Sequence, residues 1–483
     1  MYKSLNPDRL ERAGSFKLSQ VYLISYASAD GSNAPSRMNI RELIRELNIY
    51  EHLENQTLSG NIVITDATNV LQNFPVTGYE RIEFELETPG LDRGYDFSVL
   101  SGHPMFIYAV DRRQAVNPRT QSYVIRFCSI ENIKNQQRRV SKALATGIDD
   151  MMVRIMRNDL KTKKNIIVEE TSGIHKYVFP RVKPFDAIKM IGKNAQSKNF
   201  NNAGYLFYED SIGFHFKSYE SLFCLENGKP RSIVASYSPK IKNVRDGGSK
   251  DLINDYQSVE DFKIISQFNT LKNLQLGTYA SRMVTHDTFN KTFAEYDFNY
   301  LTDYGNHKHL ELDARGDVIE GNGILPLFNF EEGHTFGNFA EGTLHYGTQT
   351  KKIHNSYEYP QPQDIVQQRV SQKTALGSLV IEITVPGWTG VNVGQVVEFH
   401  LPKYAIHSQA DKKDEDIYMS GRYLISGIRH QISADSKRHT MVLELIKDSF
   451  NTAYAEELQD LFTNNEDDTG NNYKQYDIDK TLV

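Results

Sequence analysis

The segment GRYLISGIRHQISADSKRHTMVLELIKD, residues 421–448, predicts a β-hairpin near the end of the chain. Strand-favouring β-branched and aromatic residues fill both of its arms. In the second arm Met441, Leu443 and Leu445 share one face, as the two-residue period of a strand requires. We therefore expect this part of the chain to be an antiparallel sheet with one face on a core.

A similar texture fills the first part of the chain. Strands are predicted over 16–28, 61–67, 81–88, 105–113 and 122–130, with turn signals between them. The clearest alternation places Ile82, Phe84 and Leu86 on one face of a strand. The sequence thus predicts strand sets at both ends of the chain.

The two strand sets resemble each other at a shift of 317 residues. The shift aligns Gly60, Ile62 and Ile64 with Gly377, Leu379 and Ile381, Phe106 with Tyr423, and Arg112 and Gln114 with Arg429 and Gln431. Tyr123, Ile125 and Phe127 match Met441, Leu443 and Leu445 after a slip of one residue, and Ile82, Phe84 and Leu86 match Val397, Phe399 and Leu401 at a shift of 315. Alternating strands can match by coincidence, and the other interpretation is two copies of one antiparallel β-domain.

Between the two sets, the pattern changes to mixed helix and strand. Helices are predicted within 134–160 and after Pro184, and a hairpin over 204–218 turns at Asp210–Gly213. A loop-like stretch, 300–362, precedes a predicted helix over 363–375. We expect a first β-domain (1–135), an α/β insert (136–222), a second β-domain (223–299 and 363–450), a Gly/Phe-rich loop or arm (300–362) and an acidic helix and tail (451–483).

Composition excludes several classes of protein. The 483 residues carry 55 Lys and Arg against 61 Asp and Glu, so no overall basic footprint for nucleic acid exists. No apolar run approaches the length of a membrane span, and the first residues do not form a signal peptide. Two cysteines, Cys128 and Cys224, rule out a disulfide framework, and they predict a protein that is made in a reducing cytosol or is indifferent to redox state.

Charge is unevenly distributed along this balanced chain. Residues 451–483 hold eight acids and two bases, a net charge of −6, whereas 134–164 hold nine bases and three acids, a net charge of +6. Each segment is either a solvated surface or a docking surface in an assembly.

The order of these parts resembles that of the baseplate hub proteins of contractile-tailed bacteriophages. The resemblance covers about 16–450, through SIENI (129–133), IHKYVFPRVKPFDAIKMIG (174–192), GWTGVNVGQ (387–395) and GRYLISGIRHQIS…HTMVLELIK (421–447). It implies a mainly β fold with an α/β insert, in which two related barrel-like tube domains per chain build a pseudo-sixfold homotrimeric ring. Stretch 300–362 is longer than the resemblance leads us to expect, which suggests an added contact arm.

The resemblance also implies a function. The ring would be a structural symmetry adaptor between the hexameric tail tube and the trimeric central spike, with baseplate wedge proteins around it. DNA would pass through its lumen without specific binding, and the protein would lie in the virion tail baseplate after assembly in the host cytoplasm. The resemblance implies no enzymatic activity, no cofactor and no membrane insertion.

Two groups of residues are candidate contact sites. Glu83, Glu85 and Glu87 form a row on one strand, which is a solvated face, a face toward a ring lumen or subunit interface, or paired carboxylates for glycoside hydrolysis. The Gly/Phe-rich stretch carries four aromatic anchors that either fold onto this domain or order on a partner; they are Phe328, Phe330, Phe336 and Phe339.

No recognised catalytic or phosphate-binding motif occurs in the chain. His307 and His309 could join His334, His345 and His354 at a metal only if they converged, and Ser172 beside His175 has no evident orienting base. We therefore expect no catalytic, cofactor or metal residues. The alternative functions are a cell-wall polysaccharide- or peptidoglycan-degrading enzyme and a carbohydrate-binding tail protein.

Overall fold

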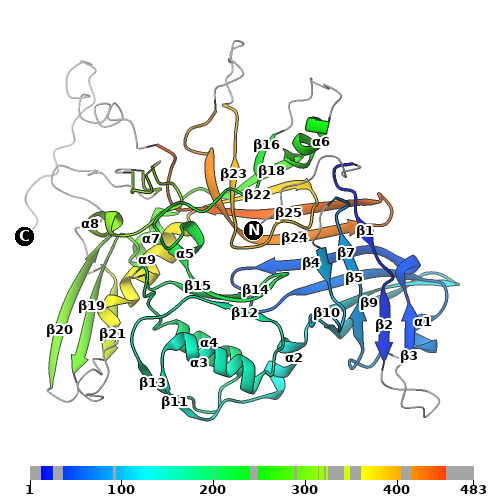
Figure 1. Ribbon diagram of the computed structural model, residues 1–483, viewed down its shortest axis with the longest axis horizontal. Helices are drawn as coiled ribbons and strands as arrows, with labels where there is room; N and C mark the ends of the chain where they lie inside the picture. Colours follow the sequence, from blue (N-terminus) through cyan, green and yellow to red (C-terminus); the bar gives the residue numbers. More distant parts are fainter. Residues whose placement is uncertain are drawn as a thin grey trace, which may run out of the picture.

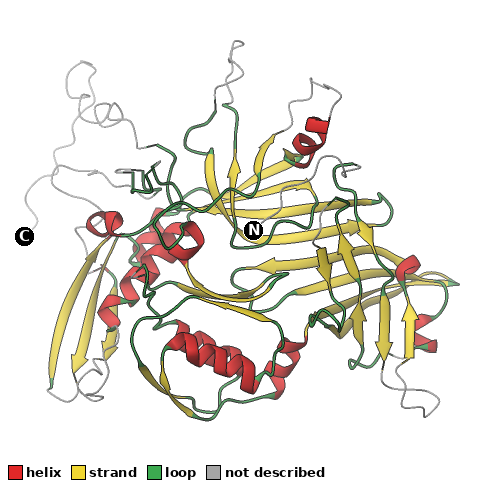
Figure 2. Cartoon of the chain, viewed as in Figure 1, coloured by secondary structure: helices red, strands yellow, loops and turns green. Residues whose placement is uncertain are grey.

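The fold is mainly β (Figure 1 and Figure 2). The computed structural model describes residues 12–25, 36–74, 76–90, 94–200, 202–239, 249–287, 291–313, 315–319, 322–324, 342–348, 361–403 and 415–452. Strands dominate the described residues. Most helices lie in the insert and beside the sheet at the left of the view (Figure 2). The predicted fold class, mainly β with an α/β insert, is confirmed at this level.

Fourteen of the described strands form one large sheet. The first part of the chain supplies β2 (Tyr22–Ser25), β3 (Ser36–Asn39), β4 (Ile44–His52), β5 (Ser59–Asp66), β6 (Arg81–Glu83), β9 (Met105–Asn117) and β10 (Thr120–Ser129). The last part supplies β16 (Ser236–Pro239), β17 (Ser258–Val259), β18 (Asp261–Ser266), β22 (Leu379–Pro386), β23 (Val396–Phe399), β24 (Gly421–Ser433) and β25 (Arg438–Lys447). The two strand sets are thus parts of one hydrogen-bonded sheet.

The two parts of the sheet repeat one order of antiparallel strands. β5 pairs with β10, β10 with β9 and β9 with β6; β22 pairs with β25, β25 with β24 and β24 with β23. The sequence repeat therefore has a counterpart in strand pairing. The shift of 317 with its slip would place Leu379 opposite Leu443, but Leu379 lies opposite Lys447, four residues further on. Because the partner is displaced by an even number of residues along β25, the same set of side chains stays on the core face.

A seam between β4 and β24 joins the two parts. Gly427–Ser433 of β24 pair with His52–Glu46 of β4, and β4 continues into β5. The other end of β24, Gly421–Leu424, pairs with β23. Because β24 has 13 residues, it is long enough to have one neighbour at each end and β25 along its other edge.

The insert combines two small sheets with short helices (Figure 1). Its strands are β11 (Ala143–Thr146), β12 (Asn165–Val168), β13 (His175–Val178), β14 (Tyr205–Glu209) and β15 (Gly213–Ser218); its helices are α2 (Ile130–Gln137), α3 (Ile148–Arg154), α4 (Pro184–Gly192) and α5 (Tyr219–Phe223). The predicted hairpin and the helix opened by Pro184 are confirmed as β14–β15 and α4. The helical prediction over 134–160 is wrong at β11, because those residues pair with β13.

Smaller elements surround the large sheet. Strands β1 (Lys17–Leu18), β7 (Glu85–Glu87) and β8 (Gly94–Asp96) form one three-stranded sheet, and β19 (Ala280–Asp287), β20 (Thr292–Asn299) and β21 (Leu344–Thr348) form another. The remaining helices are α1 (Val70–Asn73), α6 (Ser249–Tyr256), α7 (Thr270–Leu276), α8 (Tyr300–Asp303) and α9 (Val366–Leu376). The predicted helix before the last strand set is confirmed as α9. The loop prediction over 300–362 is wrong at α8 and at β21, which pairs with a strand about 60 residues earlier.

Three hydrophobic clusters underlie this arrangement. One fills the first strand set, a second fills the insert, and the third, around Trp388, Phe399 and Tyr423, fills the last strand set. Ile432 of β24 belongs to the cluster of the first strand set, although it lies in the last part of the chain. The seam thus carries apolar packing as well as backbone hydrogen bonds.

A buried ion-pair cluster joins the insert to the first strand set. Lys164 Nζ lies 3.0 Å from a carboxylate oxygen of Glu131 and 2.5 Å from one of Glu209, and all three side chains are buried. Glu209 also accepts hydrogen bonds from the Leu58 amide (2.9 Å) and the Ser129 hydroxyl (2.7 Å). Burial opposes the charge on Lys164, but the two carboxylates outweigh it and raise its pKa. A buried lysine requires such partners, so this cluster sets how the insert sits on the sheet.

Candidate functional site

The predicted row of glutamates divides between two strands. Ile82, Phe84 and Leu86 alternate with the glutamates and are buried, which confirms the alternation, and Phe84 separates β6 from β7. Glu83 lies on β6 and pairs with Arg81 at 2.8 Å, while Glu87 lies on β7 and pairs with Lys17 at 3.3 Å.

Glu85 is the exception in the row. It is exposed, makes no ion pair among the described residues and lies opposite Asp96 of β8. The negative charge of the row is therefore concentrated at Glu85 and Asp96, because neighbouring cations offset the other two glutamates.

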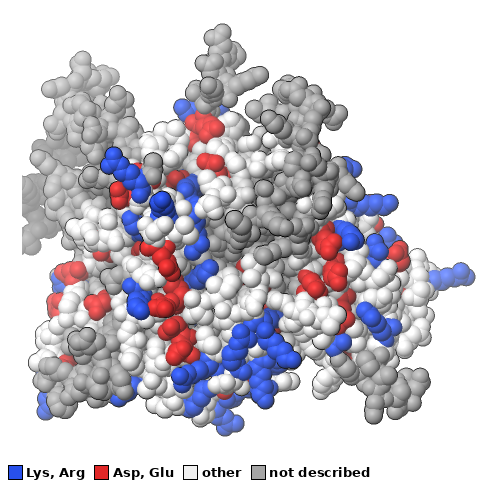
Figure 3. Space-filling model, viewed as in Figure 1, with Lys and Arg blue, Asp and Glu red and all other residues white. Residues whose placement is uncertain are grey.

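The aromatic anchors lie outside the described residues. These are Phe328, Phe330, Phe336 and Phe339, and most of the acidic tail, 453–483, also lies outside. The basic stretch of the insert is described. Arg139, Arg154, Arg157, Lys161 and Lys163 are exposed there. Figure 3 shows Lys and Arg gathered along the lower edge, where the insert lies in Figure 1.

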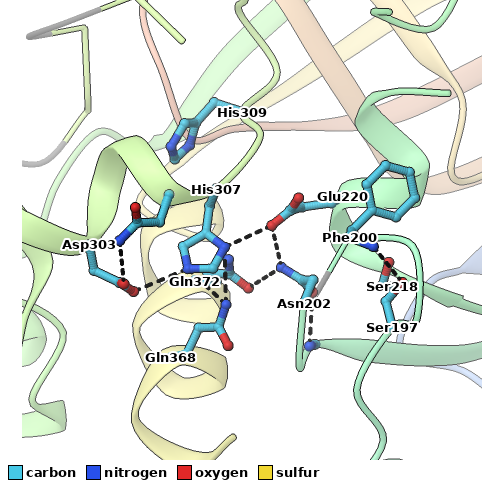
Figure 4. Close-up of polar contacts among 12 residues, drawn as sticks. Ser197, Phe200, Asn202, Ser218, Glu220, Asp303, His307, His309, Gln368 and Gln372 are labelled. Atoms are coloured by element: carbon cyan, nitrogen blue, oxygen red, sulfur yellow. Dashed lines mark hydrogen bonds and ion pairs between the residues drawn. The ribbon is translucent and has the colours of Figure 1, made fainter. Parts of the chain in front are cut away.

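His307 is the centre of a polar cluster that sequence reasoning treated only as a possible metal ligand (Figure 4). Its Nδ1 lies 2.9 Å from Glu220 of α5, and its Nε2 lies 3.1 Å from Asp303 of α8. Asn202 donates to Glu220 at 2.9 Å and to Gln372 of α9 at 2.7 Å. The cluster therefore connects the insert, α8 and α9.

Two carboxylates hold His307 in its charged form. Burial alone would lower the pKa of this imidazole, but hydrogen bonds to Asp303 and Glu220 raise its pKa to about 9. A protonated imidazole donates from both nitrogens, which matches one carboxylate on each side of the ring.

The neighbouring histidine points elsewhere. His309 stacks on Tyr304 with ring centroids 3.8 Å apart, and its Nδ1 lies 2.9 Å from Asp448.

In the described part of the chain, no group of three or more His, Cys, Asp or Glu side chains is arranged to hold a metal ion. Cys128 and Cys224 are buried free thiols. Among the described helices, none combines the length and apolar character needed to cross a bilayer.

A second polar chain lies at the seam between β4 and β24. The Tyr95 hydroxyl is 2.5 Å from Glu51 Oε1 and 2.9 Å from His430 Nε2, and His430 Nδ1 is 3.0 Å from His439 Nε2. The Val393 amide donates to the other Glu51 oxygen at 3.3 Å. All four side chains of the chain are at most 2% exposed. Strands β4, β8, β24 and β25 each contribute one of them.

Burial controls the protonation of this chain. Desolvation, together with the charge of Asp210, raises the pKa of Glu51 to about 8, so its neutral form prevails at pH 7. Burial lowers the pKa of His430 well below its usual range and that of His439 to about 3. The neutral forms of Glu51, Tyr95, His430 and His439 can each donate one hydrogen bond and accept another, so the chain is hydrogen-bonded without a buried net charge.

The sequence contained a signal for this chain. Glu51 follows Leu47 and Ile49 at two-residue spacing, and His439 precedes Met441 at the same spacing. Both polar residues therefore occupy positions whose neighbours in the alternation face the core. A polar residue at such a position requires a buried partner, but the sequence does not say which one.

Glu51→Gln tests the protonation of the seam. Glutamine resembles neutral glutamate in shape and carries no proton that must be taken up on folding. Because Glu51 has a folded pKa of about 8 and an ordinary value of 4.5, wild-type stability should fall as pH rises from about 5 to 8. We expect the variant to be about 3 kcal/mol more stable than wild type at pH 7 and equal to it at pH 4. Urea denaturation at both pH values measures this, with Glu382→Gln at an exposed position of β22 as the matched control; equal stability at pH 7 would contradict it.

His307→Gln tests the charged cluster with the same method. A histidine with a raised pKa adds stability that is fully present below about pH 6.5 and is lost as pH rises through about 9. We expect the variant to lose about 2–4 kcal/mol at pH 6 and little at pH 10. His286→Gln, at an exposed position of β19, is the control. A loss that does not vary with pH would show that His307 is neutral.

The chain is similar over most of its length to a curated phage protein. A probable baseplate hub protein of Vibrio phage KVP40 is 22% identical over 427 residues, which cover 85% of this chain and 91% of that protein. No protein-family model matches the chain.

Two solved structures also align along most of the chain. They are a tail protein from Neisseria meningitidis MC58 (10% identity, TM-score 0.47, 90% of this chain and 97% of that chain) and the 43 kDa tail protein of prophage MuSo2 from Shewanella oneidensis (9% identity, TM-score 0.47, 89% and 98%). Both TM-scores are low, so the resemblance rests on the sequence match. That match confirms the resemblance of this chain to the baseplate hub proteins of bacteriophages.

Proposed function

We propose that this protein is the hub of a contractile phage tail baseplate. Three copies form a ring that adapts the hexameric tail tube to the trimeric central spike, and baseplate wedge proteins surround it. The ring lies in the virion after assembly in the host cytoplasm. The similarity to a curated hub protein over most of both chains supports this assignment.

The repeated strand order carries the proposal. One chain contains the order β5–β10–β9–β6 and again β22–β25–β24–β23. Three chains would therefore present six related modules around one axis. A hexameric tube could then contact six similar surfaces of a trimer, which removes the symmetry mismatch between tube and spike.

Two related barrel-like tube domains, over 1–135 and over 223–299 with 363–450, are the units we propose for this ring. The insert over 136–222 is proposed as a separate docking module, since it has its own hydrophobic cluster and an exposed basic surface. The role is mechanical. Paired backbone groups of a continuous sheet transmit load without bond-making chemistry.

The mass in solution tests the trimer. Three copies of the 55.3 kDa chain weigh about 166 kDa. We expect light scattering to give this mass for the protein alone or after co-expression with the central spike protein. A monomer or dimer that the spike does not change would contradict the proposed ring.

Charge reversal at Glu85 tests whether its face borders the DNA path. This glutamate and Asp96 leave an exposed negative patch that would repel phosphate groups. In phage carrying Glu85→Lys we expect normal assembly but genome delivery slowed about two- to tenfold, because a cation attracts DNA. DNA ejection from purified virions measures the rate. Glu226→Lys, at an exposed turn just after the insert, is the control, and an unchanged rate for Glu85→Lys would remove this face from the lumen.

A further inference from the structure

Helices α7 and α9 lie beside the sheet of β19, β20 and β21 (Figure 1). Residues of both helices line a cleft. It encloses a cavity of about 430 Å³, which falls within the size range of ligand sites. Leu276 of α7 and Val370 and Thr374 of α9 are among the residues that line it. Polar side chains that line the cleft already form hydrogen bonds within the protein. Thr374 donates to the Val370 carbonyl, and Ser378 donates to the Thr374 carbonyl. The cleft therefore offers an apolar wall to an occupant.

Helix α7 leaves its apolar side chains uncovered by the described residues. Leu271 is 75% exposed and Leu276 is 41% exposed, and Phe268, just before the helix, is 69% exposed. Within the helix only Asn273 is buried. A cluster of large exposed apolar side chains beside a cavity indicates an interaction surface.

Cations surround this apolar surface. Lys272 of α7 and Arg369 and Lys373 of α9 line the cleft. Lys373 forms an ion pair with Glu54 at 2.8 Å on the surface. Arg369 donates a hydrogen bond to the Lys193 carbonyl. The rim thus has a net positive charge, and its occupant should combine apolar and acidic side chains.

The chain contains a segment of this kind. Residues 453–462, AYAEELQDLF, place Tyr454, Leu458 and Leu461 at the spacing of one helical face. Glu456, Glu457 and Asp460 occupy the other positions around that pattern. We propose that residues 453–462 occupy the α7–α9 cleft of their own chain, with the apolar residues on Leu276 and Val370 and the carboxylates at Lys272 and Lys373. This inference does not depend on the proposed hub function.

The geometry at the end of the described chain permits this contact. Asp448 and Leu376, the last residue of α9, line one small cavity, so the chain passes beside α9 shortly before Thr452. Gly377, the next residue, lines the cleft. The segment follows Thr452 directly, so it begins beside α9, whose residues form one wall of the cleft.

Disulfide trapping in the full-length chain tests the proposal. The variant carries Leu276→Cys in the cleft and Leu458→Cys in the segment, and the two native cysteines are buried. Two matched variants combine Leu458→Cys with Arg119→Cys in the β9–β10 turn, or with Lys161→Cys on the basic surface of the insert. Mild oxidation is followed by non-reducing electrophoresis and peptide mass spectrometry, which separate intrachain from interchain disulfides.

We expect an intrachain disulfide from the cleft pair at least about fivefold faster than from either matched pair. Adding Lys272→Glu and Lys373→Glu should slow it about three- to tenfold, in line with the loss of two exposed ion pairs. Equal rates for all three pairs would overturn the proposal. So would faster trapping at Lys161→Cys, which assigns the segment to the insert, or an exclusively interchain product, which assigns it to a second copy.

Discussion

The pairing of β4 with β24 is the contact on which the large sheet depends. Without it, the first strand set and the last would share no backbone hydrogen bonds among the described strands. The pairing links residues about 380 positions apart in sequence, as between Arg429 and Tyr50. Ordering so long an intervening chain is entropically unfavourable, so the seam must be stabilised by more than its ladder. Ile432 packs into the hydrophobic cluster of the first strand set. Beside it, the hydrogen-bonded side chains that run from Glu51 through Tyr95 and His430 to His439 fill the interior.

Buried polar groups occur where the parts of the molecule meet. Lys164 with its two carboxylates lies between the insert and the first strand set, and His307 lies between the insert and α9. Glu51 and its partners lie at the seam. Apolar contacts tolerate sliding, whereas a buried charge or hydrogen-bond donor requires its partner in one place. These clusters therefore fix the relative positions of parts that hydrophobic packing alone would leave less defined.

Exposed charge is separated from these junctions. The basic surface of the insert and the rim of the α7–α9 cleft are positive, whereas Glu85 and Asp96 form a negative patch on the small sheet of β1, β7 and β8. Opposite charges on different surfaces of one chain suit a component that contacts several partners, because complementary charge selects which surface meets which partner.

Local sequence patterns specify most of the strands and helices and their order. Two-residue alternation over 81–88 and 438–448 gave strands with one buried face, Pro184 opened a helix, and the repeat gave the same strand order at both ends. These features are local, because side-chain period and backbone restriction act within a few residues. The resemblance to hub proteins followed from that order.

The path of the whole chain sets which distant strands share a ladder and which polar residues meet. β11 and β21 are strands because β13 and β19 lie beside them, and no local pattern specifies that partner. Glu51 and His430 stand at core-facing positions in sequence, yet their proximity exists only because β4 and β24 pair. Alternation fixes the face on which a side chain lies, whereas its neighbour across a sheet depends on the path of the whole chain.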